Sequence, residues 1–104
     1  MVLDLSEING IENYDAKVDI DIKPDKPTKK RTLYYRDKKV FLVDNEKTLE
    51  VRTDEKLAEN LKEKYESVME SRYFGKGGIE IVPAGQLTDQ EIKDLIRLSY
   101  DLSN

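Results

Sequence analysis

The residues in this sequence whose chemistry best suits binding lie in one basic segment, from Lys23 to Lys39. The segment holds eight lysines and arginines against two aspartates, a net charge of +6, which leaves −10 for the rest of a chain whose total is −4. Ammonium and guanidinium groups contact phosphates, and Tyr34 or Tyr35 could stack on an unpaired base, which is the combination that single-strand binders use. The predicted contacts to nucleic acid are Lys26, Lys29, Lys30, Arg31, Tyr34, Arg36, Lys38 and Lys76.

Other interpretations of the same residues stay open. An acidic protein segment would be attracted by the same charges, and a charge-rich hairpin is more often only a solvated edge. Tyrosine is common on strands simply because it packs well there, and the acidic remainder of the chain weakens attraction to a polyanion. The main alternative function is a protein-interaction module, homodimeric or not, that uses a sheet edge or a sheet face.

A second candidate site is the glycine-rich sequence GKGG at residues 75–78, because glycine-rich loops cradle phosphates with backbone N–H groups. A phosphate loop requires G-x-x-x-x-G-K-[ST] between a strand and a helix. Here the glycines follow a predicted helix and precede a predicted strand, so no nucleotide site is expected. We predict a tight turn with an exposed Lys76, with binding of an anion by these amides as the alternative.

The chain has no histidine and no cysteine, which limits the kinds of catalytic and metal-binding site that it can form. Serine–histidine triads, histidine-based zinc sites, thiolate chemistry and disulfides are therefore excluded. Asp15, Asp19 and Asp21 lie close in sequence, yet they lack the glycine and the distal glutamate of a calcium loop. We expect a non-enzymatic protein without metal or cofactor; as a weaker alternative, an enzyme would need two carboxylates that the fold brings together.

The basic segment is framed by predicted strands. Residues 16–22 alternate strictly, which predicts a half-buried strand with its four even-numbered apolar residues towards the core. Two prolines then end the strand and open a basic loop. Three strand-like runs between residues 32 and 53 predict an antiparallel meander, in which the apolar run 40–43 is a central strand covered on both faces. Tyr34 and Tyr35 then point to opposite faces of the sheet.

Two helices are predicted in the second half of the chain. The first is capped by Thr53 or Asp54 and carries an apolar stripe that reaches Val68 and Met69. A short strand follows at residues 79–82, after the glycine turn. A capping box of the S/T-x-x-E type then begins the second helix at TDQE. Its buried stripe is predicted to be Ile92, Leu95, Ile96, Ser99 and Leu102.

Residues 1–104 are therefore predicted to form a single α+β domain. We expect two layers, with an antiparallel sheet of about four to five strands and two main helices on one face. Residues 1–14 form an N-terminal arm or a short helix capped by Ser6. The apolar residues expected to pack this segment on the sheet are Leu3, Leu5, Ile8 and Ile11. No apolar run approaches the length of a membrane span, and a cytoplasmic location is the default expectation.

The second half of the chain carries a family resemblance in RTDEKLAENLKEKYESV, RYFGKGGIEIV and GQLTDQEIKDLIRLSYDL. Their order resembles the MmcQ/YjbR family of small bacterial domains, in which a helix of the type DPELAEELREKY precedes an N-K-x-H-W segment and a terminal LIxxSYDL. At those characteristic positions this chain has Gly75, Lys76, Gly78 and Ile79, so only Lys76 is kept. The resemblance implies a two-layer α+β fold, like that of secretion chaperones, and carries a loose DNA-binding label.

Overall fold

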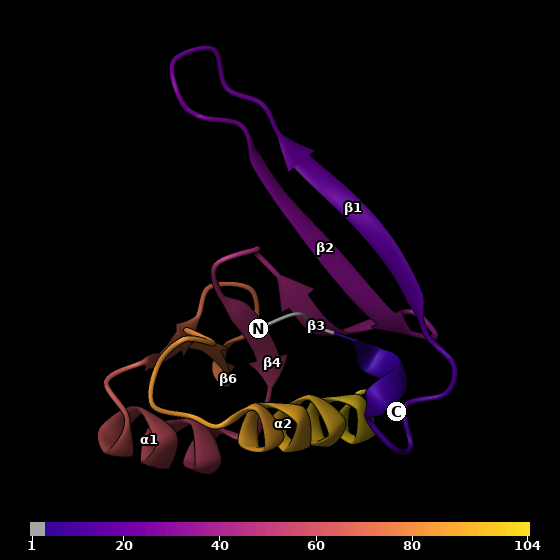
Figure 1. The fold of residues 1–104 in the computed structure, drawn as a ribbon, viewed down its shortest axis with the longest axis vertical. Helices are drawn as coiled ribbons and strands as arrows, with labels where there is room; N and C mark the ends of the chain where they lie inside the picture. The colour runs from indigo at the N-terminus through magenta and orange to yellow at the C-terminus, as the bar shows by residue number, and fades with distance from the viewer. Residues whose placement is uncertain (1–3) are drawn as a thin grey trace.

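A six-stranded antiparallel sheet is the frame of the molecule (Figure 1). The computed structural model describes residues 4–104, with Asp21 described by its backbone alone. Within this range the strands lie side by side in the order β1-β2-β3-β4-β6-β5. Their bounds are β1 Asp15–Asp21, β2 Lys29–Arg36, β3 Lys39–Asp44, β4 Leu49–Arg52, β5 Val68–Ser71 and β6 Gly75–Ile81. The α+β class is as predicted, with six strands where four to five were expected.

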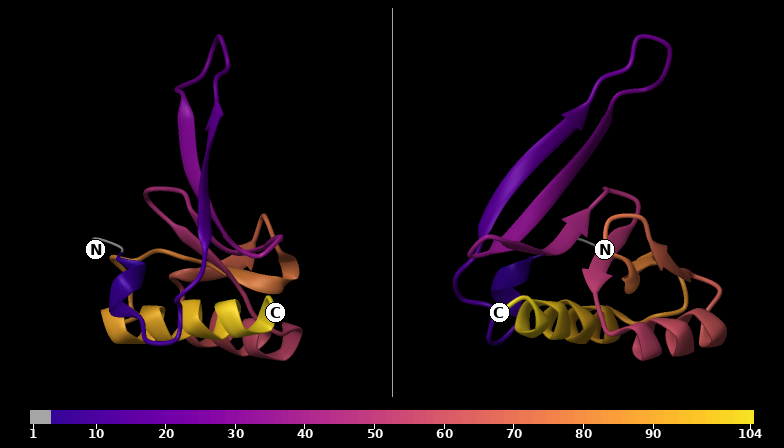
Figure 2. Two further views of the ribbon diagram at one scale, coloured as in Figure 1. Left: turned by 90° about the vertical axis from the view of Figure 1, so that its right-hand side faces the viewer. Right: turned by 180° about the vertical axis from the view of Figure 1, so that it is seen from behind.

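Both main helices cover the same face of this sheet, as predicted (Figures 1 and 2). Helix α1 (Glu55–Lys64) packs on β5 and β6, and helix α2 (Asp89–Leu102) packs on β3 and β4. Asp54 caps α1 by accepting a backbone hydrogen bond from the first turn at 2.7 Å. Thr88 and Glu91 form the predicted capping box of α2, which gives partners to backbone donors that a helix start leaves unpaired.

The main core lies between the helices and the sheet. Its largest fully buried apolar side chains come from β3, β4, β6 and α2, namely Phe41, Leu42, Val51, Ile79, Ile81, Ile92 and Ile96. Burying one aliphatic or aromatic side chain contributes about 1.5–3 kcal/mol, so these residues hold the two layers together. Ser99 of α2 is buried among them, and its hydroxyl accepts a hydrogen bond from the Arg52 N–H at 2.7 Å.

The N-terminal segment extends this core. The short 3-10 helix η1 (Leu5–Glu7) is capped by Asp4 rather than by the predicted Ser6. Asp4 takes this role because its carboxylate accepts hydrogen bonds from both the N–H and the hydroxyl of Ser6. The predicted burial is confirmed for Leu5, Ile8 and Ile11. Leu3 lies outside the described residues.

Strand β3 is buried on both faces, as its continuous apolar run predicted. Phe41 and Leu42 join the core beside the helices. The opposite surface of the sheet, which we call the open face, carries a smaller apolar cluster made by Leu33, Tyr35, Val40, Val43 and Phe74. Tyr34 lies on the helix side, where its ring packs against Phe41. The two neighbouring tyrosines of β2 therefore separate as predicted.

The first helix is shorter than its apolar stripe predicted. It ends at Lys64, and Val68 and Met69 belong to β5 instead. Tyr65 leaves the helix with an extended backbone, φ −128°, and the β-branched Val68 pairs opposite Ile81 in the sheet. Helical spacing had placed residues 68 and 69 on one stripe, but in a strand neighbours point to opposite faces, so Val68 is buried and Met69 is exposed.

The end of α2 also differs from the prediction. Four of the five predicted stripe residues pack in the core, whereas Leu102 is exposed. Tyr100 is buried instead, because Phe41 offers its ring an edge-to-face contact with centroids 5.1 Å apart. The buried stripe of α2 therefore ends with Tyr100, which pairs with Phe41, rather than with Leu102.

Strands β1 and β2 form a two-stranded arm, residues 15–36, that projects from the body of the domain (Figures 1 and 2). The prediction that β1 is half-buried is wrong, because Val18, Ile20 and Ile22 are 51%, 54% and 74% exposed. The physical reason is that the helices pack on β3, β4, β5 and β6. The apolar side of the arm therefore extends past the helical layer.

Candidate functional site

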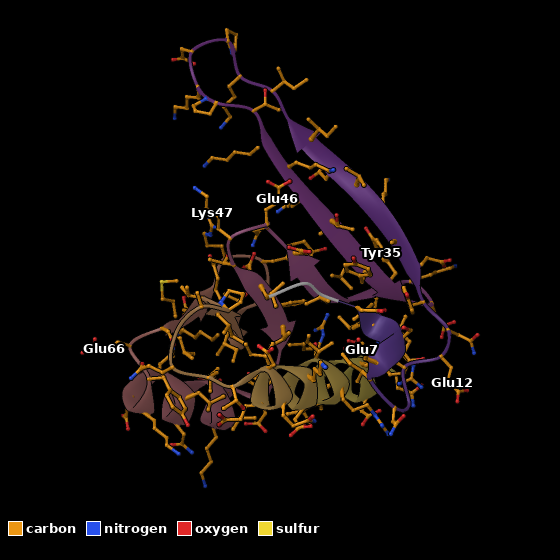
Figure 3. The ribbon with its side chains drawn as sticks, viewed as in Figure 1. Glu7, Glu12, Tyr35, Glu46, Lys47 and Glu66 are labelled. Carbon is orange, nitrogen blue, oxygen red and sulfur yellow. The ribbon has the colours of Figure 1, made fainter. Side chains whose placement is uncertain are left out.

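A groove of about 830 Å³ lies between the arm and the open face of the sheet. Three parts of the chain line it: the arm, the β3–β4 turn at residues 45–48, and a part of the sheet made by β4, the β5–β6 turn and β6. Figure 3 shows Glu46 and Lys47 on the β3–β4 turn, on the side of the arm. The side chains that give the groove its chemistry are Asp19, Lys29, Lys30, Arg31, Glu46, Lys47, Thr48, Glu50, Arg72, Tyr73 and Glu80.

The groove contains Glu50, a charged residue that is only 2% exposed. Its Oε1 accepts hydrogen bonds from the Ser71 hydroxyl and the Tyr73 N–H, both at 2.9 Å. Its Oε2 accepts from Asn45 Nδ2 at 2.8 Å. Burial alone would raise the pKa of Glu50, but these hydrogen bonds and the charge of Arg72 outweigh burial, so the pKa is lowered. Ionised Glu50 therefore ties the β3–β4 and β5–β6 turns to β4.

Glu80 lies beside Glu50, because the two residues are directly opposite each other in the β4–β6 ladder. Glu80 is 5% exposed. Arg72 contacts it with two nitrogens, Nε at 3.0 Å and Nη2 at 3.1 Å, and the Thr48 hydroxyl donates to it at 2.9 Å. Like charges directly opposite each other destabilise a sheet. Arg72 and the surrounding hydrogen-bond donors offset the repulsion between Glu50 and Glu80.

Two carboxylates in one groove are also what an acid–base enzyme would need. A general acid that works near neutral pH requires a raised pKa, whereas the pKa of Glu50 is lowered by its hydrogen bonds. Both glutamates also direct their oxygens at donors within the protein. We therefore interpret the pair as a structural support that fixes the two turns of the groove.

Arg31 links the arm to the body of the domain across the groove. Its Nε donates to Asp19 at 3.0 Å, and its guanidinium lies 5.7 Å from the centre of the Tyr73 ring. An exposed ion pair contributes about 0–1 kcal/mol, and a cation–π contact at an exposed site about 0.5–1 kcal/mol. Tyr73 remains 41% exposed in the groove lining, so part of its ring stays accessible.

Positive charge remains at the rim of the groove. Lys29, Lys30 and Lys47 are exposed, and none of them takes part in an ion pair between described side chains. The side chain of Arg72 is 69% exposed even though it contacts Glu80. The rim therefore presents cations from three separate segments of the chain, above two glutamates that protein donors already satisfy.

The structure gathers only part of the predicted contact set in this groove. Lys29, Lys30 and Arg31 line it, and Lys26 is exposed in the loop at the tip of the arm. Arg36 lies at the opposite end of β2. At about 3.4 Å per residue, the seven steps along β2 put roughly 24 Å between its two ends. The basic segment is therefore not one patch.

The other predicted residues lie elsewhere. Nη1 of Arg36 donates to the Tyr100 carbonyl at 2.9 Å and so compensates the negative end of α2. Lys38 is exposed in the β2–β3 turn, and Lys76 is exposed in β6; neither lines the groove. The Tyr34 ring packs against Phe41 with centroids 6.5 Å apart, which gives it a packing role in the core.

The glycine-rich sequence forms the start of β6 and shapes the open face. Gly75 has a φ of +66°, a conformation that glycine adopts without steric cost. At Gly78 a Cβ would lie 2.6 Å from Phe74 Cβ and 2.7 Å from the Val51 carbonyl. The missing side chain at Gly78 therefore allows Phe74 to fold over the open face, next to Tyr73.

Sequence reasoning missed Glu50, Arg72, Tyr73 and Glu80 as groove residues. Each glutamate stands between two apolar residues of a short strand, a pattern that normally predicts a solvated side chain. The alternation of the two strands is a signal that could have placed both glutamates on the face away from the helices. Only the pairing of β4 with β6 places them opposite each other, and that pairing joins segments about thirty residues apart in the chain.

Within residues 4–104, no group of three or more acidic side chains is placed to hold a metal ion. None of the helices in this range combines the length and the apolar character needed to cross a membrane. Comparison of the chain with protein-family models, with curated proteins and with solved structures finds no match. The resemblance of its second half to MmcQ/YjbR domains therefore stays a prediction.

Proposed function

We propose that this protein binds single-stranded nucleic acid in the groove between the arm and the open face. The observation that carries the proposal is the convergence of Lys29, Lys30, Lys47 and Arg72 on one groove that also contains an accessible tyrosine ring. Single-strand binders combine cations that follow the phosphates with aromatic rings on which bases stack. In this arrangement Tyr73 takes the stacking role that the sequence analysis gave to Tyr34 or Tyr35.

The charge arrangement favours a backbone that passes along the rim. Phosphates would contact Lys29 and Lys30 on the arm and Lys47 on the opposite turn, while a base reaches Tyr73 between them. Glu50 and Glu80 are satisfied by donors of the protein. Asp19 is paired with Arg31, so among the described side chains Glu46 is the one lining carboxylate that neither an ion pair nor a protein donor compensates. Three to four phosphate contacts predict a salt slope of about −2 to −3 for a single strand, so affinity should fall about 20- to 50-fold between 50 and 200 mM salt.

The test is fluorescence anisotropy with labelled twelve-nucleotide single strands of RNA and DNA and the matching duplexes, in a series of salt concentrations. The variant Lys29→Glu/Lys47→Glu should weaken single-strand binding at least tenfold at low salt. The matched control Lys38→Glu/Lys76→Glu changes the net charge equally but leaves the groove lining intact, and it should stay within about threefold of the wild type. Equal loss in both variants would indicate diffuse attraction and contradict the groove.

Tyr73 separates nucleic acid from an acidic protein segment, which would use the same cations. Tyr73→Ala should weaken binding about 5- to 100-fold if a base stacks on the ring, whereas Tyr73→Phe should retain most of the affinity. An acidic peptide of equal charge should be insensitive to Tyr73→Ala. Absence of oligonucleotide binding at 20 mM salt would overturn the proposal, because phosphate contacts are strongest there.

A further inference from the structure

The two edges of the sheet are unequal. At one edge β5 is only four residues long, and its pairing with β6 is irregular at Glu70 and Ser71. Short and irregular edge strands resist further pairing. At the other edge β1 is seven residues long and pairs in unbroken register with β2. Within the described chain its outer backbone groups face no further strand, so β1 is the edge at which another strand can add.

The side chains of β1 also favour association. Val18, Ile20 and Ile22 form an apolar row that is more than half exposed. A long edge strand with such a row is the kind of surface that natural proteins normally cover, shorten or interrupt. The opposite side of the same strand carries alternating charges, with Lys17 between Asp15 and Asp19. The apolar row supplies attraction, and the charges decide which partner strand fits.

Two copies of β1 can pair antiparallel in several registers in which the same face of both strands lies on the same side of the sheet. These registers differ in which charged residues lie opposite each other. With Val18 on the two-fold axis, Lys17 of each copy lies opposite Asp19 of the other, but Asp15 lies opposite Asp21, so two attractive pairs are offset by two like-charge pairs. With Lys17 on the axis, two lysines meet, and Asp15 lies opposite Asp19. Moving the axis to Ile20 places Asp19 opposite Asp21 and Lys17 opposite Lys23. Like charges directly opposite are destabilising, so none of these three registers gives more attractive pairs than repulsive ones.

Among the registers that pair at least five residues of β1 from each copy, this leaves the one with Asp19 on the axis. Lys17 of each copy then lies opposite Asp21 of the other, and Val18 lies opposite Ile20, so the apolar rows meet. The only like-charge pair is Asp19 with its copy. Each Asp19 already has a counter-charge, because Arg31 Nε of its own chain lies 3.0 Å away. The charge order of β1 is therefore complementary to itself in this register.

We propose that two copies of this chain associate through β1, antiparallel, with Asp19 on the two-fold axis. The two six-stranded sheets join into one continuous sheet, and the exposed rows of Val18 and Ile20 cover each other. The axis is perpendicular to the sheet, so both open faces lie on the same side. The outer edge of the arm thereby gains a neighbouring strand.

Single cysteines test the register, because the chain has no cysteine of its own. Directly opposite residues of antiparallel strands have Cα atoms about 4.5–5.5 Å apart, which suits a disulfide. Asp19→Cys should therefore form a disulfide-linked dimer in a glutathione buffer. Val18→Cys is the control: its copy lies diagonally, at about 7–8 Å, and should cross-link at least tenfold less. The reverse result, or equal cross-linking of both, would overturn the proposal.

Charge reversal tests the same pairing without a covalent bond. Sedimentation velocity from about 10 μM to 1 mM should give a wild-type dimer whose population rises with concentration. Lys17→Asp and Asp21→Lys should each weaken the dimer about tenfold, because two attractive pairs become repulsive. The double variant Lys17→Asp/Asp21→Lys should return to within about threefold of the wild type. A chain that stays monomeric up to 1 mM, or a double variant without rescue, would refute self-pairing.

Discussion

Replacement of Glu50 tests how the groove is built. Glu50→Ala removes the acceptor of the Ser71 hydroxyl, the Tyr73 N–H and the Asn45 amide. Ser71 is buried and the Tyr73 N–H is partly buried, so two donors lose their partner where water reaches them poorly. Each such loss costs about 1–3 kcal/mol, while relief of repulsion against Glu80 returns about 1 kcal/mol. We expect the free energy of unfolding to fall by about 2–4 kcal/mol.

Glu50→Gln removes the negative charge of the side chain but keeps its size and shape. Its remaining oxygen can still accept from Ser71 and Tyr73, so the expected loss at pH 7 is about 1–2 kcal/mol. The pKa of Glu50 is lower in the folded state than its ordinary value of about 4.3. Ionised Glu50 therefore contributes stability that is complete well above pH 4.3 and is lost as the pH falls through the folded-state pKa. The difference between wild type and Glu50→Gln should shrink accordingly below about pH 4.

The assay is urea denaturation followed by far-UV circular dichroism at pH 7, 5, 4 and 3. Glu46→Gln is the matched control, because Glu46 is exposed on the β3–β4 turn; it should change stability by less than about 0.5 kcal/mol. A loss below about 1 kcal/mol for Glu50→Ala would refute the anchoring role. A difference between wild type and Glu50→Gln that stays constant from pH 7 to pH 3 would refute the assigned pKa direction.

Three further substitutions can be measured in the same urea titrations at pH 7. Gly78→Ala should cost about 1–3 kcal/mol, because its Cβ would lie 2.6 Å from Phe74 Cβ and 2.7 Å from the Val51 carbonyl; a neutral result would contradict this close packing. Thr88→Ala should cost about 1 kcal/mol by removing the capping box, whereas Thr88→Ser should be nearly neutral; equal losses would contradict the cap. Arg36→Ala should cost about 1–2 kcal/mol through its bond to the Tyr100 carbonyl, and a loss no larger than that of Lys38→Ala would disprove this role.

Local patterns predicted most of the fold because the relevant interactions are local. The Thr88 and Glu91 box, the alternation of β1 and the central position of residues 40–43 all depend on side chains within a few residues of each other. The prediction failed where a distant partner decided the outcome. Val68 fits a helical stripe or a strand equally well, and its pairing with Ile81 decides for the strand. The exposure of β1 depends on where the helices end, which the strand's own sequence does not encode.

The candidate site was less predictable for the same reason. The basic segment indicated positive charge correctly, and Lys29, Lys30 and Arg31 do line the groove. The remaining groove residues come from the β3–β4 turn, β4, the β5–β6 turn and β6, which lie across the groove from the arm only in the folded chain. Tyr73 is one residue after Arg72 in a turn, and no spacing in the sequence relates it to Arg31, 5.7 Å away across the groove.

Nucleic-acid binding in the groove and self-pairing through β1 depend on different residues of the arm, so the two proposals can be tested separately. Binding in the groove depends on lysine side chains at Lys29 and Lys47, whereas self-pairing depends on the outer backbone of β1 and on Lys17 opposite Asp21. Lys17 does not line the groove, so Lys17→Asp should weaken association without removing a phosphate contact. Association would also place two grooves on the same side of one sheet. A nucleic-acid strand long enough to reach both would then gain affinity through effective concentration rather than through new contacts.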